Sequence, residues 1–526
     1  MTEAAAKLGS IACLATLFFA CMGEGGRDVN LSPGHWPERE LEKFTALQNI
    51  FYEPHPLGEG RKAMVAGIQG ALAVRGGFQP ESWRQVGFQV TVLEPGAFMP
   101  TGQPLLAVRG GRSSVEDLTI NDGARSGVTL IEVSGGALHL SGVELLVGQP
   151  GSRGIRVVGA ALEVTGSRLT ATTTAPLVEQ SGGTLRAAGT TFRAQGVAPV
   201  PALLHLRDGA EGRFESVTVD PGSGDRTLGL LSDSARVVVT SGTWSTGAGR
   251  RRAVALEAHG GELTLAGPLL RGAPGAGYSY GVVTRDTRLR TADTRFEVDG
   301  QFGGTGLQLR GGAVTIDSAR LTGGSPSEYL YLIDAAGVSI QLFNSILTGG
   351  TTGDFAAVLL SGGSADLLGN TVIVGTGNRL TVGIQGRDVG RLRVVNNIVV
   401  HRGVPVGTGL DVVAEELSVL TNNLAGFSVA LRTHAGSAVS IEQTNQLDGV
   451  PFAGTIDGNL GESFERIFRI DKQETFELAS EARLVNAGTD VARLFGGPGI
   501  DYEGRPRPAP FVGPRPAFDI GALELY

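Results

Sequence analysis

The segment Val394-Val-Asn-Asn-Ile-Val-Val400 places two asparagines, which favour turns, inside a run of residues that favour β-strands. An asparagine returns at an interval of 26 residues, at Asn344, Asn370, Asn396 and Asn422. A polar residue that recurs at a fixed interval among apolar residues indicates that the chain repeats one structural unit.

The repeated unit has a Gly or Ala, two apolar residues one position apart, a few small or polar residues, and another apolar residue. The clearest copies are GGALHLSGVEL (135–145), AALEVTGSRL (160–169), GGELTLAGPLL (260–270) and GGAVTIDSARL (311–321). The second apolar position gives one anchor per repeat: Val115, Leu140, Val164, Ala187, Phe214, Val239, Leu265, Thr291, Ile316, Leu342, Leu368, Val394 and Leu420. Alternating runs such as VALEA (254–258) lie between these anchors, so each repeat carries at least two short strands.

Strands this short cannot bury a face alone, but strands of successive repeats can pair in parallel and enclose a common apolar core. The spacing therefore predicts an all-β fold, a right-handed parallel β-helix (solenoid) of roughly 13 to 15 coils over residues 65–447. A β-propeller would need longer blades of four strands. An antiparallel sandwich would show hairpin turns instead of one repeated phrase.

The asparagine interval predicts a ladder inside this solenoid. Asn tolerates left-handed backbone angles, and its amide can bond to the equivalent amide one coil away. We expect Asn344, Asn370, Asn396 and Asn422 to form this ladder where a strand bends, with a structural role. We expect Asn397 and Asn423 to face outward.

The first residues contain Lys7 followed by an apolar stretch, Leu8 to Ala20, which is shorter than a membrane-spanning helix. The Ala20-Cys21 pair resembles the lipobox of bacterial lipoproteins, which implies removal of residues 1–20 as a signal peptide and a lipid anchor on Cys21. Met22 resembles the residue that leaves such proteins in the outer membrane. Plain secretion and an uncleaved anchor are the alternatives.

Segments at both ends of the repeats are expected to cover the core. Residues 21–64 are interpreted as a tether and amino-terminal cap, with a helix over 36–51 in which Leu41, Phe44 and Leu47 share one face. Residues 448–526 are interpreted as a carboxyl-terminal cap that shields the last coil. Three residues of this cap are expected to be structural: Asp501, Arg505 and Asp519.

The phrases FNSIL, GNTVI, VNNIV and TNNLA resemble coils of the pectin-lyase-like, right-handed β-helix superfamily. Residues 71–84 (ALAVRGGFQPESWR) resemble the first coil of bacterial surface β-helix proteins. The closing segments 468–490 and 501–526, with an intact Asp519-Ile-Gly-Ala-Leu-Glu524, resemble secreted bacterial β-helix proteins of the choice-of-anchor Q type. The resemblance implies a fold and a secretion route, but no particular reaction.

The sequence holds no recognised catalytic signature of this superfamily. The motifs Asn-Thr-Asp, Gly-x-Asp-Asp, Gly-His-Gly and Arg-Ile-Lys are absent, and no Asp-Asp pair occurs, which disfavours a polygalacturonase-type hydrolase. The best cluster of ionisable residues comprises Arg387, Asp388, Arg391 and Arg393, with Glu415 and Glu416 one coil later. A solvated turn with ordinary ion pairs would give the same pattern. No histidine pair has metal-ligand spacing, so no metal or other cofactor is expected, except Ca²⁺ if the protein were a lyase.

Aromatic residues recur at one position of successive coils. Tyr278, Tyr329 and Phe355 each follow an anchor by 13 residues, and Phe302 lies close to that position in the intervening coil. Such a row could stack on sugar rings at the surface, or could form an internal aromatic stack.

These observations favour a non-enzymatic, lipid-anchored cell-surface or outer-membrane scaffold for adhesion, matrix contact or glycan binding. The alternative is a polysaccharide lyase or glycoside hydrolase acting on an extracellular polysaccharide. The expected partner is a polysaccharide or a cell-surface component, and the protein is expected to be a monomer. The net charge of −8 argues against a nucleic-acid partner.

Overall fold

The computed structural model describes residues 104–523 except 197–200, 274, 403, 434–435, 439, 446–454, 469–475, 477, 496–498 and 508–517. Before residue 104 it describes Pro95 and the backbone of six strands: β1 (Phe18–Ala20), β2 (Arg27–Asn30), β3 (Ile50–Leu57), β4 (Arg61–Ile68), β5 (Leu72–Arg75) and β6 (Thr91–Leu93). Cys21 and residues 36–49 of the predicted helix lie outside the described residues.

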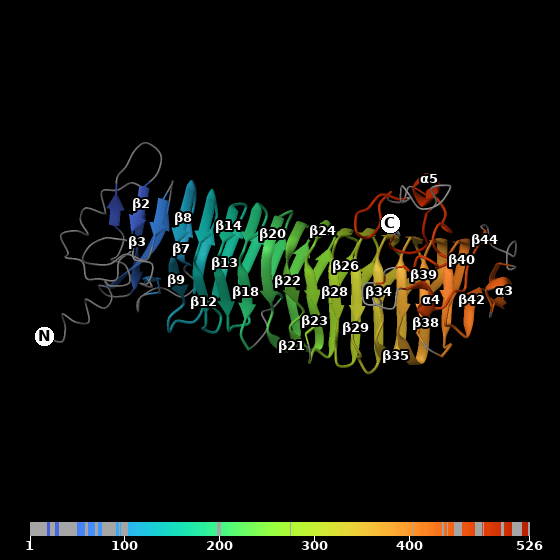
Figure 1. Ribbon diagram of the computed structural model, residues 1–526. Coiled ribbons are helices and arrows are strands. Elements are labelled where there is room, and N and C mark those ends of the chain that lie inside the picture. The colour runs from blue at the N-terminus through green and yellow to red at the C-terminus, as the bar shows by residue number, and fades with distance from the viewer. Residues whose placement is uncertain are drawn as a thin grey trace. The chain divides into compact units, whose positions relative to one another are not determined.

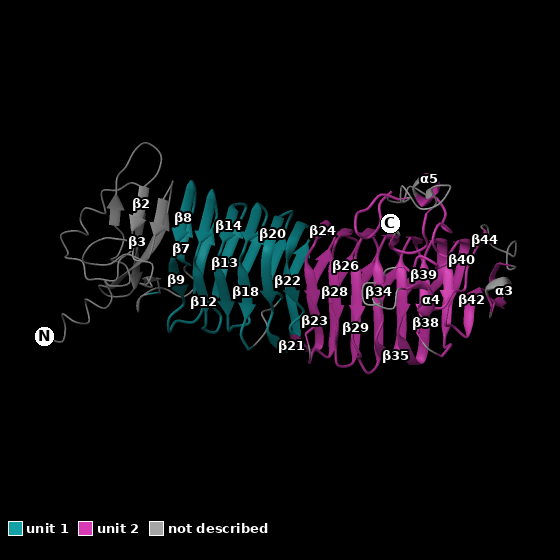
Figure 2. Ribbon diagram, in the orientation of Figure 1, with its two compact units in different colours: residues 1–247 teal, residues 248–526 magenta. Residues whose placement is uncertain are grey.

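The fold is an all-β parallel solenoid of about 13 turns, as predicted, and it belongs to the right-handed parallel β-helix class (Figure 1). Each coil contributes a strand, or part of a longer strand, to three faces, and strands of one face pair in parallel with those of neighbouring coils. The chain divides into two compact units, residues 1–247 and 248–526 (Figure 2).

In the first unit the described strands form three series. The first face comprises β7 (Pro104–Val108), β10 (Thr129–Val133), β13 (Arg153–Val158), β16 (Val178–Ser181), β19 (Leu204–Arg207) and β21 (Ser223–Asp233). The second face comprises β8 (Arg112–Glu116), β11 (Ala137–Ser141), β14 (Ala161–Thr165), β17 (Thr184–Ala188), and the beginnings of β20 (Glu211–Asp220) and β22 (Arg236–Ser245). The third face comprises β9 (Leu118–Asn121), β12 (Glu144–Val147), β15 (Arg168–Ala171), β18 (Thr191–Ala194), and the ends of β20 and β22.

The second unit continues the same three series. The first face comprises β23 (Ala248–His259), β26 (Tyr278–Arg285), β29 (Gly303–Arg310), β32 (Tyr329–Ala336), β35 (Thr351–Ser361), β42 (Val429–Thr433), and the beginnings of β38 (Thr376–Val395) and β40 (Thr408–Leu420). The second face comprises β24 (Glu262–Ala266), β27 (Arg288–Ala292), β30 (Ala313–Asp317), β33 (Ser339–Phe343), β36 (Ser364–Leu368), β44 (Ile456–Asp457), and the ends of β38 and β40. The third face comprises β25 (Leu269–Arg271), β28 (Arg295–Val298), β31 (Arg320–Gly323), β34 (Ile346–Thr348), β37 (Thr371–Val374), β39 (Ile398–His401) and β41 (Asn423–Ala425).

The strand registers test the anchors one by one. Within each unit the anchors pair coil to coil as aligned, for example Leu140 with Val164 and Ile316 with Leu342. Two anchors are wrong by one residue, because the residue that pairs with Leu342 is Leu367, and the residue that pairs with Val394 is Val419. The anchors that point inward are fully buried, so one apolar side chain per coil fills the core at this level.

The asparagines form two rows in neighbouring positions. The row at the bend has left-handed backbone angles: Ser318, Asn344, Gly369, Asn396 and Thr421. The row one residue later points inward and forms the hydrogen-bonded ladder: Ser345, Asn370, Asn397, Asn422 and Asn459. Each backbone N–H of this inner row, up to Asn422, donates to the amide oxygen of the next coil at 2.9–3.0 Å.

Asn370 and Asn422 therefore lie in the ladder, whereas Asn344 and Asn396 lie in the bend row. The prediction that Asn397 and Asn423 face outward is wrong, since both are buried. The reason is that successive ladder residues are separated by 25, 27 and 25 positions, so a constant interval of 26 passes from one row to the other.

The described part of residues 448–526 packs along the outer side of the third face (Figure 1). Short helices α3 (Ile441–Asn445), α4 (Phe464–Ile467) and α5 (Val491–Phe495) lie in this end of the chain. Its apolar cluster with the third face contains Ile346, Ile373, Ile398, Val400, Phe464, Ile467, Phe468, Phe476, Leu478, Leu484, Ile520 and Ala522. Strands β37 and β39 are buried on both sides for this reason.

Candidate functional site

Five aromatic side chains gather on the first face of the second unit. This aromatic surface comprises Tyr278 and Tyr280 on β26, Phe302 just before β29, and Tyr329 and Tyr331 on β32. Phe302 is 37% exposed, and the four tyrosines are half-buried. Apolar ring area at this position is outside the core and is available to a ligand.

Gly303 brings two of these rings together across a coil. The strand register places Tyr278, Gly303 and Tyr329 on successive rungs of the first face. A Cβ atom at Gly303 would lie 2.5 Å from the Tyr329 ring and 2.8 Å from the Tyr278 ring. Because Gly303 has no side chain, the two rings lean over it and stack with 5.9 Å between their centroids.

Further ring contacts extend this stack. Tyr331 stacks on Tyr329 with centroids 5.0 Å apart, and Phe302 packs against Tyr278 at 5.8 Å. The hydroxyls of Tyr280 and Tyr329 lie 3.1 Å apart. Burial, and then the hydrogen bond with Tyr280, raises the pKa of Tyr329, and burial raises the pKa of Tyr331. Both phenols therefore stay protonated, which leaves their hydroxyls able to donate and to accept hydrogen bonds.

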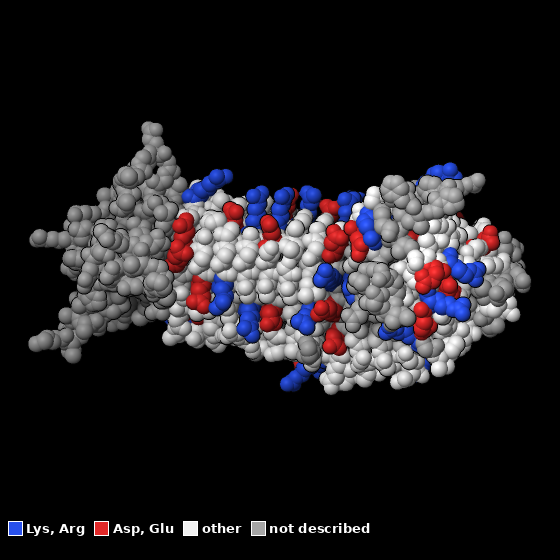
Figure 3. Space-filling view, viewed as in Figure 1, with Lys and Arg blue, Asp and Glu red and all other residues white. Residues whose placement is uncertain are grey.

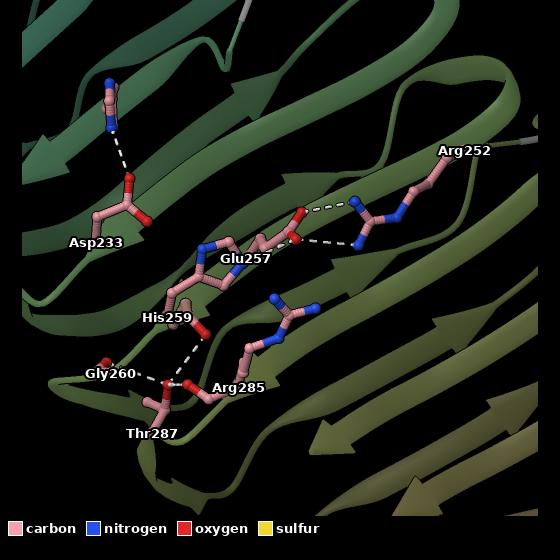
Figure 4. Close-up of polar contacts among 9 residues, drawn as sticks. Asp233, Arg252, Glu257, His259, Gly260, Arg285 and Thr287 are labelled. Carbon is pink, nitrogen blue, oxygen red and sulfur yellow. Dashed lines mark hydrogen bonds and ion pairs between the residues drawn. The ribbon is translucent and has the colours of Figure 1, made fainter. Parts of the chain in front are cut away.

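A charged cluster borders the aromatic surface on β23. Figure 4 shows the guanidinium of Arg252 facing the Glu257 carboxylate, to which it donates two hydrogen bonds of 3.0 and 3.1 Å. Nε2 of His259 lies 3.1 Å from the same carboxylate. Arg252 also lies over the ring of Tyr280, 5.7 Å from its centroid. The cluster holds Arg252 against the aromatic surface.

A second ion pair borders the aromatic surface on β35 and β38. Arg379 donates to both oxygens of Asp354, at 3.1 and 2.8 Å, and this hydrogen bonding raises the pKa of Arg379. The same guanidinium donates to the backbone oxygen of Glu328 at 3.0 Å. The Glu328 carboxylate accepts a hydrogen bond of 2.9 Å from the Tyr278 hydroxyl, which raises the pKa of Tyr278.

The structure places three of the four predicted aromatic residues in this surface: Tyr278, Phe302 and Tyr329. Phe355 is instead fully buried and pairs with Leu330, one residue out of register. Asp354 occupies the rung beside Tyr329, because this coil reaches the first face one residue sooner than the count of 13 assumes. Tyr280 and Tyr331 were missed, although the two-residue period of a strand puts them on the same side as Tyr278 and Tyr329.

The six ionisable residues considered as a catalytic cluster have separate partners. Arg387 donates to Asp411 at 2.6 Å, whereas Arg391 and Arg393 lie 3.5 and 3.7 Å from Asp366. Asp388 has a left-handed backbone in a turn, with φ of 53°. Glu415 and Glu416 are exposed, and Glu416 pairs in register with Arg391. The contacts match those of ordinary ion pairs between coils.

Within the described residues, no group of three or more His, Cys, Asp or Glu side chains is arranged to hold a metal ion. In the same part of the chain, no helix is both long and apolar enough to cross a membrane. Asp501 is fully buried and accepts hydrogen bonds from Nε of Arg505 and from backbone amides, and Asp519 accepts one from the backbone of Asn486.

The fold thus defines the class of protein, a parallel β-helix, and the aromatic surface is its best-formed candidate site. Comparison of the chain with protein-family models, with curated proteins and with solved structures finds no match.

Proposed function

We propose that this protein is a non-enzymatic β-helix scaffold that binds a glycan through its aromatic surface. The observation that carries the proposal is the contiguous set of half-exposed rings over three neighbouring coils, with hydroxyl and charged groups at its margins. Sugar rings present apolar C–H faces and hydroxyl edges. Aromatic rings beside fixed hydrogen-bonding groups suit both.

The setting proposed for this scaffold rests on the sequence. The resemblances to the pectin-lyase-like superfamily and to choice-of-anchor Q proteins support a secreted bacterial protein, and the lipobox-like Ala20-Cys21 supports a lipid anchor at the outer membrane or cell surface. Labelling of cells with a radioactive fatty acid tests the anchor. Label should enter the wild-type chain and not the Cys21→Ser variant, and label in both variants would contradict lipidation at Cys21.

The test of glycan binding uses one glycine as a switch. Gly303→Ala places a methyl group where the Tyr278 and Tyr329 rings meet, so it should separate the rings without removing either. Gly390→Ala is the matched control, since its new Cβ would lie no closer than 3.4 Å to a neighbouring atom. A screen of immobilised neutral and acidic polysaccharides identifies a ligand for the wild-type protein.

Gly303→Ala should then weaken binding about tenfold while Gly390→Ala binds like the wild type. Equal binding by both variants would show that the aromatic surface is not the glycan site. The same incubations, followed by absorbance of unsaturated products and by reducing ends, test the alternative of a lyase or hydrolase. Product release would favour that alternative.

A further inference from the structure

We propose a second saccharide site, on the second face of the first unit, that takes an uncharged, hydroxyl-rich sugar unit. The site is a shallow depression of about 540 Å³. Its lining includes Glu163, Thr165, Arg186, Ala188, Arg213 and Glu215. We call it the second-face depression. The inference rests on the proposed glycan binding and adds another site and the class of sugar.

The strand register explains the depression. One row of outward side chains runs through Glu163, Arg186 and Arg213 on β14, β17 and β20. The adjacent row on the same strands runs through Thr165, Ala188 and Glu215. Ala188 is the smallest of these residues, so it leaves a hollow between the longer side chains around it.

The two arginines are placed at a cost. Arg186 and Arg213 are directly opposite each other on neighbouring strands, where like charges repel. Neither guanidinium forms an ion pair or a hydrogen bond with any described residue, and the Glu215 carboxylate has no such partner either. These three groups therefore retain their full hydrogen-bonding capacity for a ligand.

The opposite side of the depression is held by His139. Its Nδ1 lies 3.3 Å from the Glu163 carboxylate, and its Nε2 lies 3.4 Å from the Thr165 hydroxyl. This arrangement presents acceptors on one margin of the hollow, whereas the two guanidiniums present donors on the other. Neighbouring hydroxyls of a sugar act as donor and acceptor at once, so they match such a mixed lining.

The charges in the lining also indicate an uncharged ligand. Two arginines and two glutamates line the depression, so their formal charges cancel. Figure 3 shows the same mixture more widely, with acidic and basic side chains interspersed over the described part of the visible face. A site without net charge attracts no ion over distance, yet it can bind hydroxyls by charge-assisted hydrogen bonds. Its volume lies within the range of small-molecule sites.

The experiment measures how many molecules of a neutral oligosaccharide bind to the full chain. Isothermal titration with short neutral oligosaccharides is applied to the wild type, to Arg186→Met/Arg213→Met, and to Gly303→Ala. Arg168→Met is the control, because Arg168 is an exposed residue of the same unit on the third face. We expect two bound molecules per chain for the wild type and the control, and one for each site variant.

Other results separate this inference from the proposed function. One bound molecule, lost only in Gly303→Ala, would overturn the second site and leave the aromatic surface in place. One bound molecule, lost only in the double arginine variant, would support the second site and contradict the aromatic one. No binding by any neutral oligosaccharide would overturn both. Stronger binding of a uronate or sulfated oligosaccharide at the arginines would overturn the uncharged class of ligand.

Discussion

At the scale of single residues, neighbouring asparagines have different structural roles. Asn397 accepts hydrogen bonds from the backbone and side chain of Asn370, and it donates to Asn422 and to backbone oxygens within the coils. Asn396, one position earlier, bonds instead to both backbone groups of Thr489. The first residue joins coils to each other, and the second joins the coils to the carboxyl-terminal segment.

Replacement of Asn397 tests the ladder. Asn397→Ala leaves buried donors and acceptors of two neighbouring coils without partners, so we expect a loss of about 3 kcal/mol of local stability. Hydrogen exchange of the amides in β36–β41 measures it, since repeat proteins can unfold in parts. The exposed Asn378 provides the control, Asn378→Ala. Equal protection in both variants would contradict a stabilising ladder.

His401 predicts a pH dependence of stability. Burial lowers the pKa of His401 below its ordinary value of 6.5 in the folded chain. The unfolded chain therefore takes up a proton at higher pH than the folded chain. The contribution of His401 to stability is thus complete above about pH 6.5 and declines as the pH falls toward the lowered value.

The measurement is the thermal midpoint at several pH values between about 7.5 and 5. His401→Gln should lose less stability over this interval than the wild type, because glutamine does not titrate. The difference between the two proteins isolates His401 from other titrating groups. Parallel pH profiles would contradict the prediction.

At the scale of elements, charged side chains connect strands of the first face in a repeated arrangement. On β29, Gln308 and Arg310 both donate to Asp334 on β32. On β38, Gln385 and Arg387 both donate to Asp411 on β40. In each case the arginine also donates to the backbone oxygen of that aspartate. Paired strands are therefore tied through side chain and backbone together.

Replacement of Asp411 tests this connection between strands. Asp411 is buried, so Asp411→Asn removes a charge that Arg387 contacts at 2.6 Å, and we expect a loss of about 2 kcal/mol. Asp388→Asn in the following turn is the control, because asparagine tolerates the left-handed backbone there. Chemical denaturation followed by circular dichroism measures both. An equal effect of the two substitutions would rule out a specific role for the Asp411 contact.

At the scale of the molecule, the carboxyl-terminal segment gives the last coils a second apolar layer. Phe468 is fully buried between Phe464 and Phe476, with ring centroids 4.9 and 5.6 Å away. Arg402 on the solenoid side lies over the Phe464 ring at 4.2 Å. The outward isoleucines of the third face would be exposed to water without this segment.

Phe468→Ala should therefore loosen the segment while the coils stay folded. Removal of a buried phenylalanine costs about 3–5 kcal/mol, and most of this loss should fall on the segment. Limited proteolysis should cut residues 464–523 faster in Phe468→Ala than in the wild type. Leu494→Ala, at a side chain that is 52% exposed, should not change the rate. An unchanged rate in Phe468→Ala would contradict this role.

The sequence alone determined the fold class, because a core shared between coils requires apolar residues at one position of every repeat. Val115, Leu140 and Val164 show that regularity directly. It also pointed to Tyr278, Phe302 and Tyr329, since residues at one position of successive coils lie on one face.

Only the tertiary structure decided what depends on register to within one residue. A shift of one position moves a side chain from the surface to the interior, which is why Phe355 is buried and why Asn397, rather than Asn396, joins the ladder. Coil length varies by one or two residues, and a constant interval averages over that variation. The contact of Tyr278 with Tyr329 depends on the absent side chain of Gly303, which no periodicity in the sequence reveals.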